Sequence, residues 1–488
     1  MRVLFYYRGG EHIGLESLIS YLKSKGHEVE LIFDPGLGDN GFLDIPILNK
    51  FCNDQLVIEK AIRFRPDLIA FCSITNLYSA ITKIAKKFKE VFDVPIIIGG
   101  IHPTSLPEEV IKEDCYDMLC VGEGEEALEE LLQRLKEKSS YADIKNLWVK
   151  DGSGKIHRNP KRLLIKSLDT LPPPDKTLFH KYGVLTSRLM VMTARGCPFT
   201  CTYCVNSFRN ELYSSEKYLR QRSVPNVMEE LIHLKNTYNP KGFRFEDDVF
   251  AYNVKWLREF KEVYRQHINL PFHCYVTPST AKDSVLKELK EAGCSSVSMG
   301  IQSGSVEIRK KLLNRNHSDE SIILAAQRIK KYKIKLNTEF IFGFPEETPA
   351  DMFKSLELND QLSAHSTSSF IFYPYPQTYL AKYCLEKGYL SDDNYKLIKQ
   401  GYGSYHTTCL LNHDYINEVY KFKSILPVYN KIPKLLKPLF RKILTLEYGF
   451  LHKFIYSISI PLHDFDEFIT RVKGIPKMII KTRNALRK

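Results

Sequence analysis

Two successive series of short apolar strands and amphipathic helices constrain the fold of this chain more than any other feature. In the first series we expect strands at Val3–Tyr7, Val29–Phe33, Leu68–Cys72, Pro95–Gly99 and Met118–Val121, and helices at Leu15–Lys25, Tyr78–Phe92 and Glu125–Lys136. Alternation of this kind is typical of α/β proteins with a parallel sheet. The first series therefore predicts a flavodoxin-like, Rossmann-type domain that binds its ligand at the carboxyl ends of the strands.

The second series contains six strand-and-helix units. Its expected strands are Arg188–Met192, Gly242–Glu246, Phe272–Val276, Ser296–Ile301, Leu336–Phe342 and Ser368–Tyr373. The expected helices between them are Pro225–Thr237, Val254–His267, Ala281–Ala292, Ser318–Tyr332 and Pro349–Leu362. A closed barrel of parallel strands normally needs eight units. Six units predict an open, partial (β/α)6 barrel.

The chain is long enough for several domains. It has 488 residues, of which 43% are hydrophobic and 26% charged, as in ordinary globular proteins. We expect a first domain over residues 1–145, a linker over 146–182 that includes three consecutive prolines, the barrel over 183–400, and a basic helical region over 401–488. No apolar run has the length of a membrane span, and the first residues do not resemble a signal peptide. A cytoplasmic location is therefore expected.

Three of the eleven cysteines are close together, directly after the first strand of the second series. Cys197, Cys201 and Cys204 have the spacing CxxxCxxC. Three thiolates on one loop can bind three irons of a 4Fe–4S cluster, which leaves the fourth iron open to a small molecule. A structural zinc site would need a fourth ligand nearby, and the next histidine is His233. The spacing therefore indicates an iron–sulfur cluster.

Small and polar residues follow several of the expected strands. At the carboxyl ends of the first series they are Ser73, Thr75, Asn76, Gly99, Gly100, His102, Gly122 and Glu123. Glycines there let the backbone approach a large, flat or phosphate-bearing ligand, although each could also be only a tight turn. In the second series the corresponding residues are Asp247, Asp248, Gln302, Ser303 and Glu339. Their position predicts binding or catalysis. The alternatives are capping for Asp248 and Thr348, and a solvated turn for Glu346 and Glu347.

The cysteine motif and the partial barrel together resemble the radical S-adenosylmethionine superfamily. The resemblance implies that the open iron chelates S-adenosylmethionine and that the reduced cluster cleaves it to a 5′-deoxyadenosyl radical. It also implies that Tyr203, the aromatic residue before the third cysteine, packs near the adenine. Asp247, Asp248, Gln302, Ser303 and Glu339 would then contact S-adenosylmethionine.

The first domain resembles the cobalamin-binding domain that precedes the barrel in one subgroup of this superfamily. The resemblance implies that Ser73, Thr75 and Asn76 approach the corrin face and that the nucleotide tail lies along the glycine-rich strand ends. The DxHxxG signature, which supplies a histidine to cobalt in other cobalamin proteins, is absent, and neither His12 nor His102 lies in such a pattern. Cobalamin without a protein histidine beneath the cobalt is therefore implied.

The subgroup implies an enzyme, most often one that methylates an unactivated carbon of a small molecule or lipid. Its members also include a magnesium-porphyrin cyclase and ring-rearranging enzymes. RNA methylthiotransferases share the barrel but carry a second cysteine triad, whereas Cys52, Cys72, Cys115 and Cys120 are widely spread here. A non-enzymatic cofactor carrier would not need the S-adenosylmethionine site. An external electron donor such as flavodoxin or ferredoxin is implied, and nucleic acid is not an expected partner.

Much of the net charge of +13 lies in the last residues of the chain. Residues 415–488 contain 15 Lys and Arg against 5 Asp and Glu, and basic and apolar residues interleave over 431–442, 450–456 and 475–481. Such segments can lie on an anionic membrane surface. The alternative is a helical cap over the open barrel with solvated lysines. The sequence leaves both possibilities open, so peripheral membrane association is an expectation.

Overall fold

The computed structural model describes residues 1–36, 54–429, 431–455 and 465–487, which form two compact units. The first unit contains residues 1–185 together with 395–402 and 473–488. The second contains residues 186–394 and 403–472. Among the described helices, none is both long enough and apolar enough to cross a membrane.

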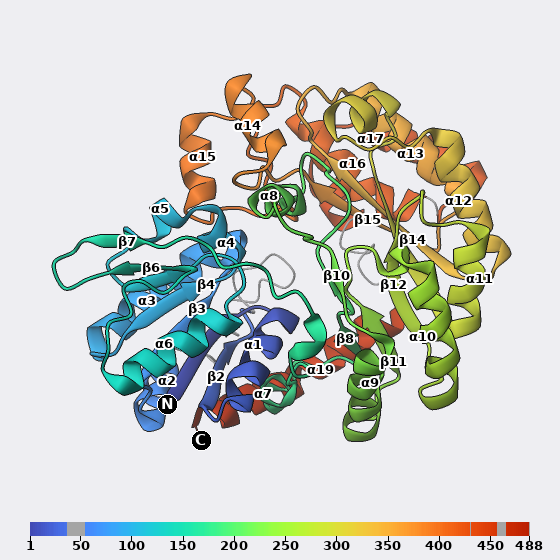
Figure 1. The fold of residues 1–488 in the computed structure, drawn as a ribbon. Helices are drawn as coiled ribbons and strands as arrows, with labels where there is room; N and C mark the ends of the chain where they lie inside the picture. The colour runs from blue at the N-terminus through green and yellow to red at the C-terminus, as the bar shows by residue number, and fades with distance from the viewer. Residues whose placement is uncertain (37–53, 430, 456–464, 488) are drawn as a thin grey trace. The chain divides into compact units, whose positions relative to one another are not determined.

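A seven-stranded sheet forms the centre of the first unit (Figure 1). Its order is β2-β1-β3-β4-β5-β6-β7, and the first five strands are parallel. The strands are β1 (Arg2–Arg8), β2 (Glu28–Asp34), β3 (Leu68–Cys72), β4 (Ile96–Gly99), β5 (Met118–Cys120), β6 (Leu147–Lys150) and β7 (Ile156–Arg158). The order 2-1-3-4-5 of the parallel strands is that of flavodoxin. The predicted fold of this part is therefore confirmed.

Helices cover both faces of this sheet. They are α1 (Ile13–Ser24), α2 (Asp54–Phe64), α3 (Tyr78–Val91), α4 (Ile101–Ser105), α5 (Pro107–Val110), α6 (Glu125–Glu137) and α7 (Thr177–Tyr182). The parallel strands between them are nearly all buried, which explains their continuous apolar runs. Helix α2 was not among the predicted elements.

The second unit contains a six-stranded parallel sheet with the order β15-β14-β13-β12-β11-β8. Its strands are β8 (Arg188–Val191), β11 (Gly242–Phe245), β12 (Phe272–Val276), β13 (Cys294–Gln302), β14 (Lys335–Phe342) and β15 (Ser366–Ile371). No pairing joins β15 to β8 in this sheet of described strands, so it is an open half-barrel. The predicted partial barrel is confirmed.

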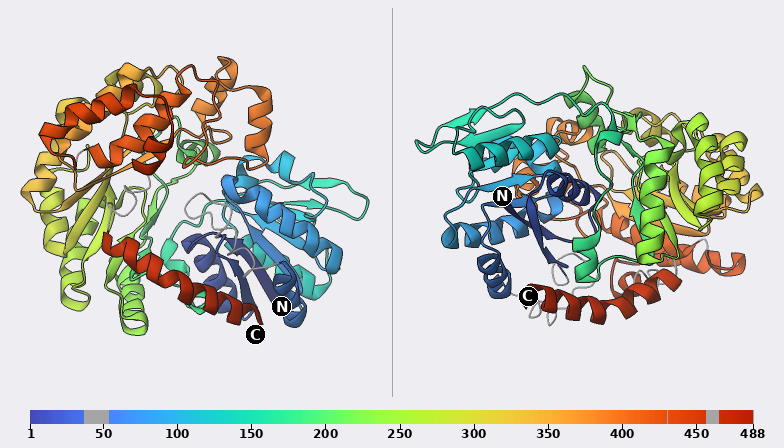
Figure 2. Two further views of the ribbon diagram at one scale, coloured as in Figure 1. Left: turned by 180° about the vertical axis from the view of Figure 1, so that it is seen from behind. Right: turned by 60° about the horizontal axis from the view of Figure 1, so that its bottom comes forward.

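The two faces of the half-barrel differ in accessibility. Its outer face is covered by α9 (Val224–Tyr238), α10 (Val254–His267), α11 (Asp283–Ala292), α12 (Asp319–Lys331) and α13 (Pro349–Leu362) (Figure 2). On β14, Leu336, Thr338, Phe340 and Phe342 are buried, whereas the alternating Asn337, Glu339 and Ile341 keep some accessible surface. Since successive side chains of a strand point to opposite faces, Asn337 and Glu339 lie on the more accessible inner face.

The chain after the half-barrel is helical. It forms α14 (Tyr379–Glu386), α15 (Asp392–Lys399), α16 (Ile416–Tyr429), α17 (Lys437–Thr445) and α19 (Phe465–Arg487). Helix α16 packs on β15, where Ser369 Oγ donates to the Lys423 carbonyl at 2.6 Å. The end of α19 belongs to the first unit, and Leu486 is part of its core.

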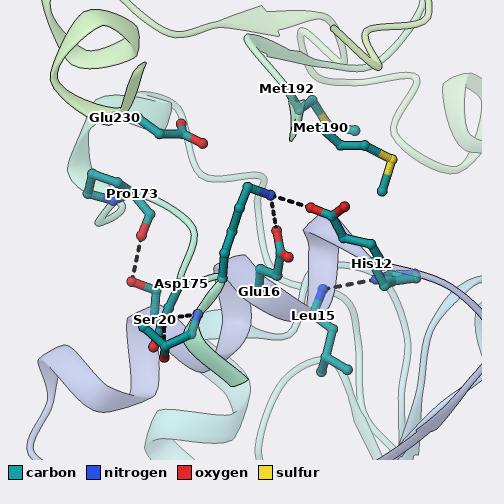
Figure 3. A network of polar contacts seen from close by, with 12 residues as sticks. His12, Leu15, Glu16, Ser20, Pro173, Asp175, Met190, Met192 and Glu230 are labelled. Atoms are coloured by element: carbon teal, nitrogen blue, oxygen red, sulfur yellow. Dashed lines mark hydrogen bonds and ion pairs between the residues drawn. The ribbon is translucent and has the colours of Figure 1, made fainter. Parts of the chain in front are cut away.

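A buried ion triad anchors α1 to the proline-rich segment that follows the first sheet. The ammonium of Lys176 lies 2.7 Å from carboxylate oxygens of both Glu11 and Glu16. Figure 3 labels Glu16, whose carboxylate makes one of the contacts drawn as dashed lines. All three side chains are almost completely buried. Burial lowers the pKa of Lys176, but the attraction of Glu16 and Glu11 outweighs this effect and holds that pKa above its usual value. Lys176 therefore stays charged and compensates two buried carboxylates.

We expect Lys176→Met to lower the free energy of unfolding by about 3–5 kcal/mol, because it leaves buried carboxylates without their cation. Lys112→Met is the matched control, since the Lys112–Glu109 pair is exposed in the same unit. Such exposed pairs contribute about 0–1 kcal/mol. Denaturant titration of both variants would measure the difference, and equal losses would contradict the role of the triad.

Candidate functional site

The loop that carries the three cysteines begins at a position that requires glycine. Gly196 follows β9 (Ala194–Arg195), which pairs with β10 (Arg220–Gln221). Its φ is +99°, and a Cβ there would lie 2.6 Å from the Tyr218 carbonyl oxygen. A side chain would therefore clash with the backbone of the opposite segment, so glycine is what lets the loop start here.

Hydrogen bonds from α8 (Val205–Leu212) hold the loop in place. Asn210 Nδ2 donates to the carbonyl oxygens of Cys197 and Phe199, at 3.1 and 3.3 Å. The amide of Cys204, the residue before α8, donates to the Cys201 carbonyl at 3.1 Å. No sequence pattern predicts this role of Asn210. These contacts hold the backbone of the cysteine loop against α8.

The cysteine side chains are partly or fully enclosed. Cys201 is buried, and Cys197 and Cys204 are half-buried. Burial raises the pKa of Cys197 to about 12 and that of Cys204 to about 11. Both are therefore thiols at neutral pH in this structure, and metal binding must release their protons. Within the described part of the chain, no group of three or more His, Cys, Asp or Glu side chains lies close enough to hold a metal ion.

The two aspartates after β11 have different surroundings. Asp247 Oδ1 accepts hydrogen bonds from the amide and the hydroxyl of Thr193, at 2.9 and 2.8 Å. Its Oδ2 is buried without a partner, and burial raises the pKa of Asp247 to about 7. Asp248 is exposed and accepts from Asn206 Nδ2 at 2.8 Å. Asp247 thus anchors the end of β8, which precedes the cysteine loop. Asp248 contacts α8, which follows that loop.

Arg315 lies beside the cysteine loop, although no sequence pattern pointed to it. Its guanidinium donates to Cys201 Sγ at 3.5 Å and to the Gly300 carbonyl at 2.6 Å. It also interacts with the hydroxyl of Tyr203. Arg315 is 8% exposed, and its Nε has no partner. A buried positive charge is therefore held against one of the predicted cluster ligands.

Glu339 lies on the strand next to Gly300, in register with it. Burial raises the pKa of Glu339 to about 7, Arg315 lowers it and Glu246 raises it further. The amide of Gln302 fills the space above Gly300, where a Cβ would lie 2.4 Å from Gln302 Nε2. The structure thus brings Tyr203, Gln302 and Glu339 together with Arg315.

Ser303 has a different position from these residues. It is fully buried, and its hydroxyl accepts from the Ser305 amide at 3.1 Å. Its carbonyl accepts from Arg309 at 2.7 Å. Both polar groups of Ser303 are thus engaged in the turn after β13, and a contact with S-adenosylmethionine remains a prediction.

Glu347 is buried, so the alternative of a solvated turn is wrong for this residue. It is 1% exposed and accepts from the amides of Gly343 and Phe344, at 2.7 and 3.3 Å. Phe344 in turn packs edge-on against Tyr203, with ring centroids 6.1 Å apart. Burial raises the pKa of Glu347 to about 8. Glu347 therefore shapes the turn that supports the aromatic residue of the cysteine loop, whereas Thr348 is a helix cap, for α13.

In the first unit, the carboxyl ends of β3, β4 and β5 form one edge. Asn76, Gly99, Gly100, Gly122 and Glu123 keep accessible surface there. Ser73 and Thr75 are buried, and Ser73 Oγ donates to the Ile74 carbonyl at 3.0 Å. The accessible rim therefore consists mostly of backbone and small residues.

Gly100 allows two of these strand ends to approach closely. Its φ is +106°, and a Cβ would lie 2.5 Å from the Ser73 carbonyl oxygen. His102 is fully buried, and its ring centroid lies 4.1 Å from that of Tyr78. Burial lowers the pKa of His102 to about 3, so its ring is neutral. His12 instead caps α1, where its Nδ1 accepts from the Leu15 amide at 3.0 Å.

Comparison with known proteins places both units in established families. Residues 191–358 match the model of the radical SAM superfamily, and residues 7–132 match the B12 binding domain. An uncharacterized methyltransferase of Pyrococcus horikoshii is 31% identical over 79% of this chain and 81% of its own. The chain belongs to the cobalamin-binding radical S-adenosylmethionine enzymes.

Two further similarities show how varied this group is. The anaerobic magnesium-protoporphyrin IX monomethyl ester cyclase of Rubrivivax gelatinosus is 25% identical over 77% of this chain and 68% of its own. The structure of the radical S-adenosylmethionine methyltransferase TsrM from Kitasatospora setae, with cobalamin and a 4Fe–4S cluster bound, has a TM-score of 0.63. That similarity covers 79% of this chain and 75% of the other at 19% identity, which shows a shared fold.

The cofactors of this radical S-adenosylmethionine enzyme are a 4Fe–4S cluster, S-adenosylmethionine and cobalamin. The donor chemistry fits the cluster, because three cysteines share one anchored loop with a guanidinium against the sulfur of Cys201. The unpartnered buried atoms Arg315 Nε and Asp247 Oδ2 leave polar groups for a further ligand in that unit. The accessible glycine edge of the first unit fits a large cofactor. The individual residue roles remain predictions.

We expect single Cys197→Ala, Cys201→Ala and Cys204→Ala variants to lose the visible absorbance of the cluster and all cleavage of S-adenosylmethionine. Each change removes one thiolate from a site that has only three. Cys115→Ala is the control, because Cys115 is a buried cysteine of the first unit, whereas the motif lies in the second. Iron analysis of the triple variant tests the assignment, and retention of about four irons per chain would contradict it.

The buried Glu347 predicts a pH-dependent stability. Since its pKa is raised from 4.5 to about 8 on folding, the folded chain binds an extra proton between these values. The contribution of Glu347 to stability therefore falls as the pH rises through this range. We expect Glu347→Gln, which imitates the protonated acid, to be more stable than the wild type above pH 8 and to lack this part of the slope.

Denaturant titrations across this pH range compare the two proteins. Glu346→Gln is the matched control, because Glu346 is the adjacent carboxylate and is exposed. It should follow the wild-type curve. A Glu347→Gln curve parallel to that of the wild type would show that Glu347 does not titrate as described.

Proposed function

We propose that this enzyme transfers a methyl group to an unactivated carbon of a small-molecule or lipid substrate. The observation that carries the proposal is the union, in one chain, of a cobalamin-binding unit with a half-barrel whose first strand is followed by CxxxCxxC. Its similarity to a methyltransferase of P. horikoshii supports the same reaction class. When bound, S-adenosylmethionine on the reduced cluster supplies a carbon-centred radical, and cobalamin supplies the methyl group.

The chain's own residues prepare the half-barrel for this chemistry. Cys197, Cys201 and Cys204 would hold the cluster, and Arg315 places a positive charge beside the sulfur of Cys201. Hydrogen bonds to cluster sulfurs tune reduction potentials, so Arg315 favours acceptance of an electron. That electron would come from an external donor such as flavodoxin or ferredoxin. Glu339, with a pKa of about 7, can hold or release a proton on the inner face of the sheet.

The first unit would hold cobalamin along the edge formed by Asn76, Gly99, Gly100, Gly122 and Glu123. Gly100 lies close to the backbone of Ser73, and a side chain at position 100 would displace the end of β3. Glycine at this position therefore keeps the ends of β3 and β4 close together. His12 caps α1 through its Nδ1, and His102 is fully buried with its ring packed against Tyr78. Their positions support cobalamin bound without a protein histidine on cobalt.

Anaerobic turnover with labelled S-adenosylmethionine tests the reaction. With trideuteromethyl S-adenosylmethionine and candidate substrates, we expect a product heavier by one trideuteromethyl group, together with 5′-deoxyadenosine and S-adenosylhomocysteine. Cys204→Ala should yield none of these. If the substrate is converted with formation of 5′-deoxyadenosine but takes up no label, methyl transfer is wrong. The cyclase or rearrangement reaction, which the similarity to the R. gelatinosus cyclase favours, would then apply.

A further inference from the structure

We propose that an exposed apolar surface of the second unit binds reversibly to membranes that contain anionic lipids. We call it the C-terminal apolar surface. It consists of Leu435, Leu436, Leu439, Leu446, Phe450, Leu451 and Phe454. The inference does not depend on which reaction the enzyme catalyses, because it concerns a surface outside the cysteine site.

The exposure of these side chains is unusual for a folded protein. Leu435 is 89% exposed, Phe450 83% and Leu439 57%. Of the twenty large hydrophobic residues that are exposed in the described chain, seven lie between positions 435 and 454. Single exposed apolar residues are ordinary, whereas a concentrated group marks an interaction surface.

The arrangement of these residues directs them outward together. Leu435, Leu439 and Leu446 follow one another at helical spacing along α17 and its ends. Phe450 and Phe454 are one turn apart and stacked, with ring centroids 6.2 Å apart. His452 Nε2 donates to the Ile443 carbonyl at 3.1 Å, which holds the two segments together. The side chains of Leu444, His452 and Ile455 are buried instead. One side of this helical segment therefore packs on the protein, and its other side is apolar and exposed.

The charges around this surface favour an anionic partner. Residues 431–455 contain six Lys and Arg and a single acidic residue, Glu447. Arg441, Lys442 and Lys453 are exposed. An isologous contact between two copies would bring these cations opposite one another, which disfavours self-association. An anionic bilayer surface accepts both the cations and the apolar side chains.

The third basic segment of the sequence does not contribute to this surface. Residues 475–481 lie in α19, where Ile475, Met478 and Ile479 are partly buried. A Cβ at Gly183 would lie 2.9 Å from Lys481 and 3.6 Å from Met478, so this helix packs within the first unit. The proposal is therefore limited to residues 435–454 and the cations that flank them.

Flotation of the full-length, reconstituted protein with lipid vesicles tests the proposal. We expect weak binding to phosphatidylcholine alone and stronger binding as phosphatidylglycerol is added. Leu439→Ser combined with Phe450→Ser should lower the partition coefficient at least about tenfold, since two exposed anchors are removed. Lys442→Gln should lower it about fivefold on anionic vesicles.

Matched controls distinguish binding by this surface from nonspecific hydrophobic binding to vesicles. Leu163→Ser combined with Ile62→Ser removes exposed apolar residues of the first unit and should bind vesicles as the wild type does. Cluster absorbance and thermal unfolding of each variant establish that it is folded. Absence of binding at every composition, or equal loss in the control pair, would overturn the proposal. So would a lipid-free dimer that the Leu439 and Phe450 changes dissociate, because the surface would then join two copies of the chain.

Discussion

The site of the second unit depends on how the cysteine loop is anchored. Parallel strands bring their carboxyl ends to one edge, but the loop after β8 still needs a defined course. Asp247, at the end of β11, fixes Thr193 through two hydrogen bonds, and Asn210 fixes the loop from α8. Buried polar groups are costly unless they are paired, so these contacts favour one backbone conformation over the alternatives.

The same edge gathers buried polar side chains that the isolated loop lacks. Arg315 comes from the segment after β13, and Glu347 from the turn after β14. Arg315 contacts a cysteine directly, whereas Glu347 acts through the backbone of Phe344 and the ring packing on Tyr203. The loops after β8, β13 and β14 thus contribute to the surroundings of one motif. The cysteine motif is therefore surrounded by side chains from other loops of the half-barrel.

The strands and the cysteine motif could be predicted because their signals are local. Buried parallel strands such as β3 and β4 are short apolar runs, and CxxxCxxC lies in eight consecutive residues. Arg315 and Glu347 could not be predicted in the same way. One is an arginine in a basic segment and the other a glutamate in a turn, and only the tertiary fold buries them. The sequence patterns did not predict helix α2 either. Ser303 was a candidate ligand contact, but its hydroxyl accepts a hydrogen bond within the turn after β13.

The return of the chain to its first unit affects the order in which the protein can be completed. Leu486, in the last turn of α19, is fully buried in the core of that unit, and Ala485 lies beside it. At Gly401, a Cβ would lie 2.6 Å from the Thr75 carbonyl oxygen, so residues 395–402 also pack tightly there. Domains usually fold during synthesis, starting from the N-terminus. Here the flavodoxin-like sheet is synthesised long before residues 485 and 486, so the nascent first unit keeps part of its apolar surface uncovered until these later residues have been made.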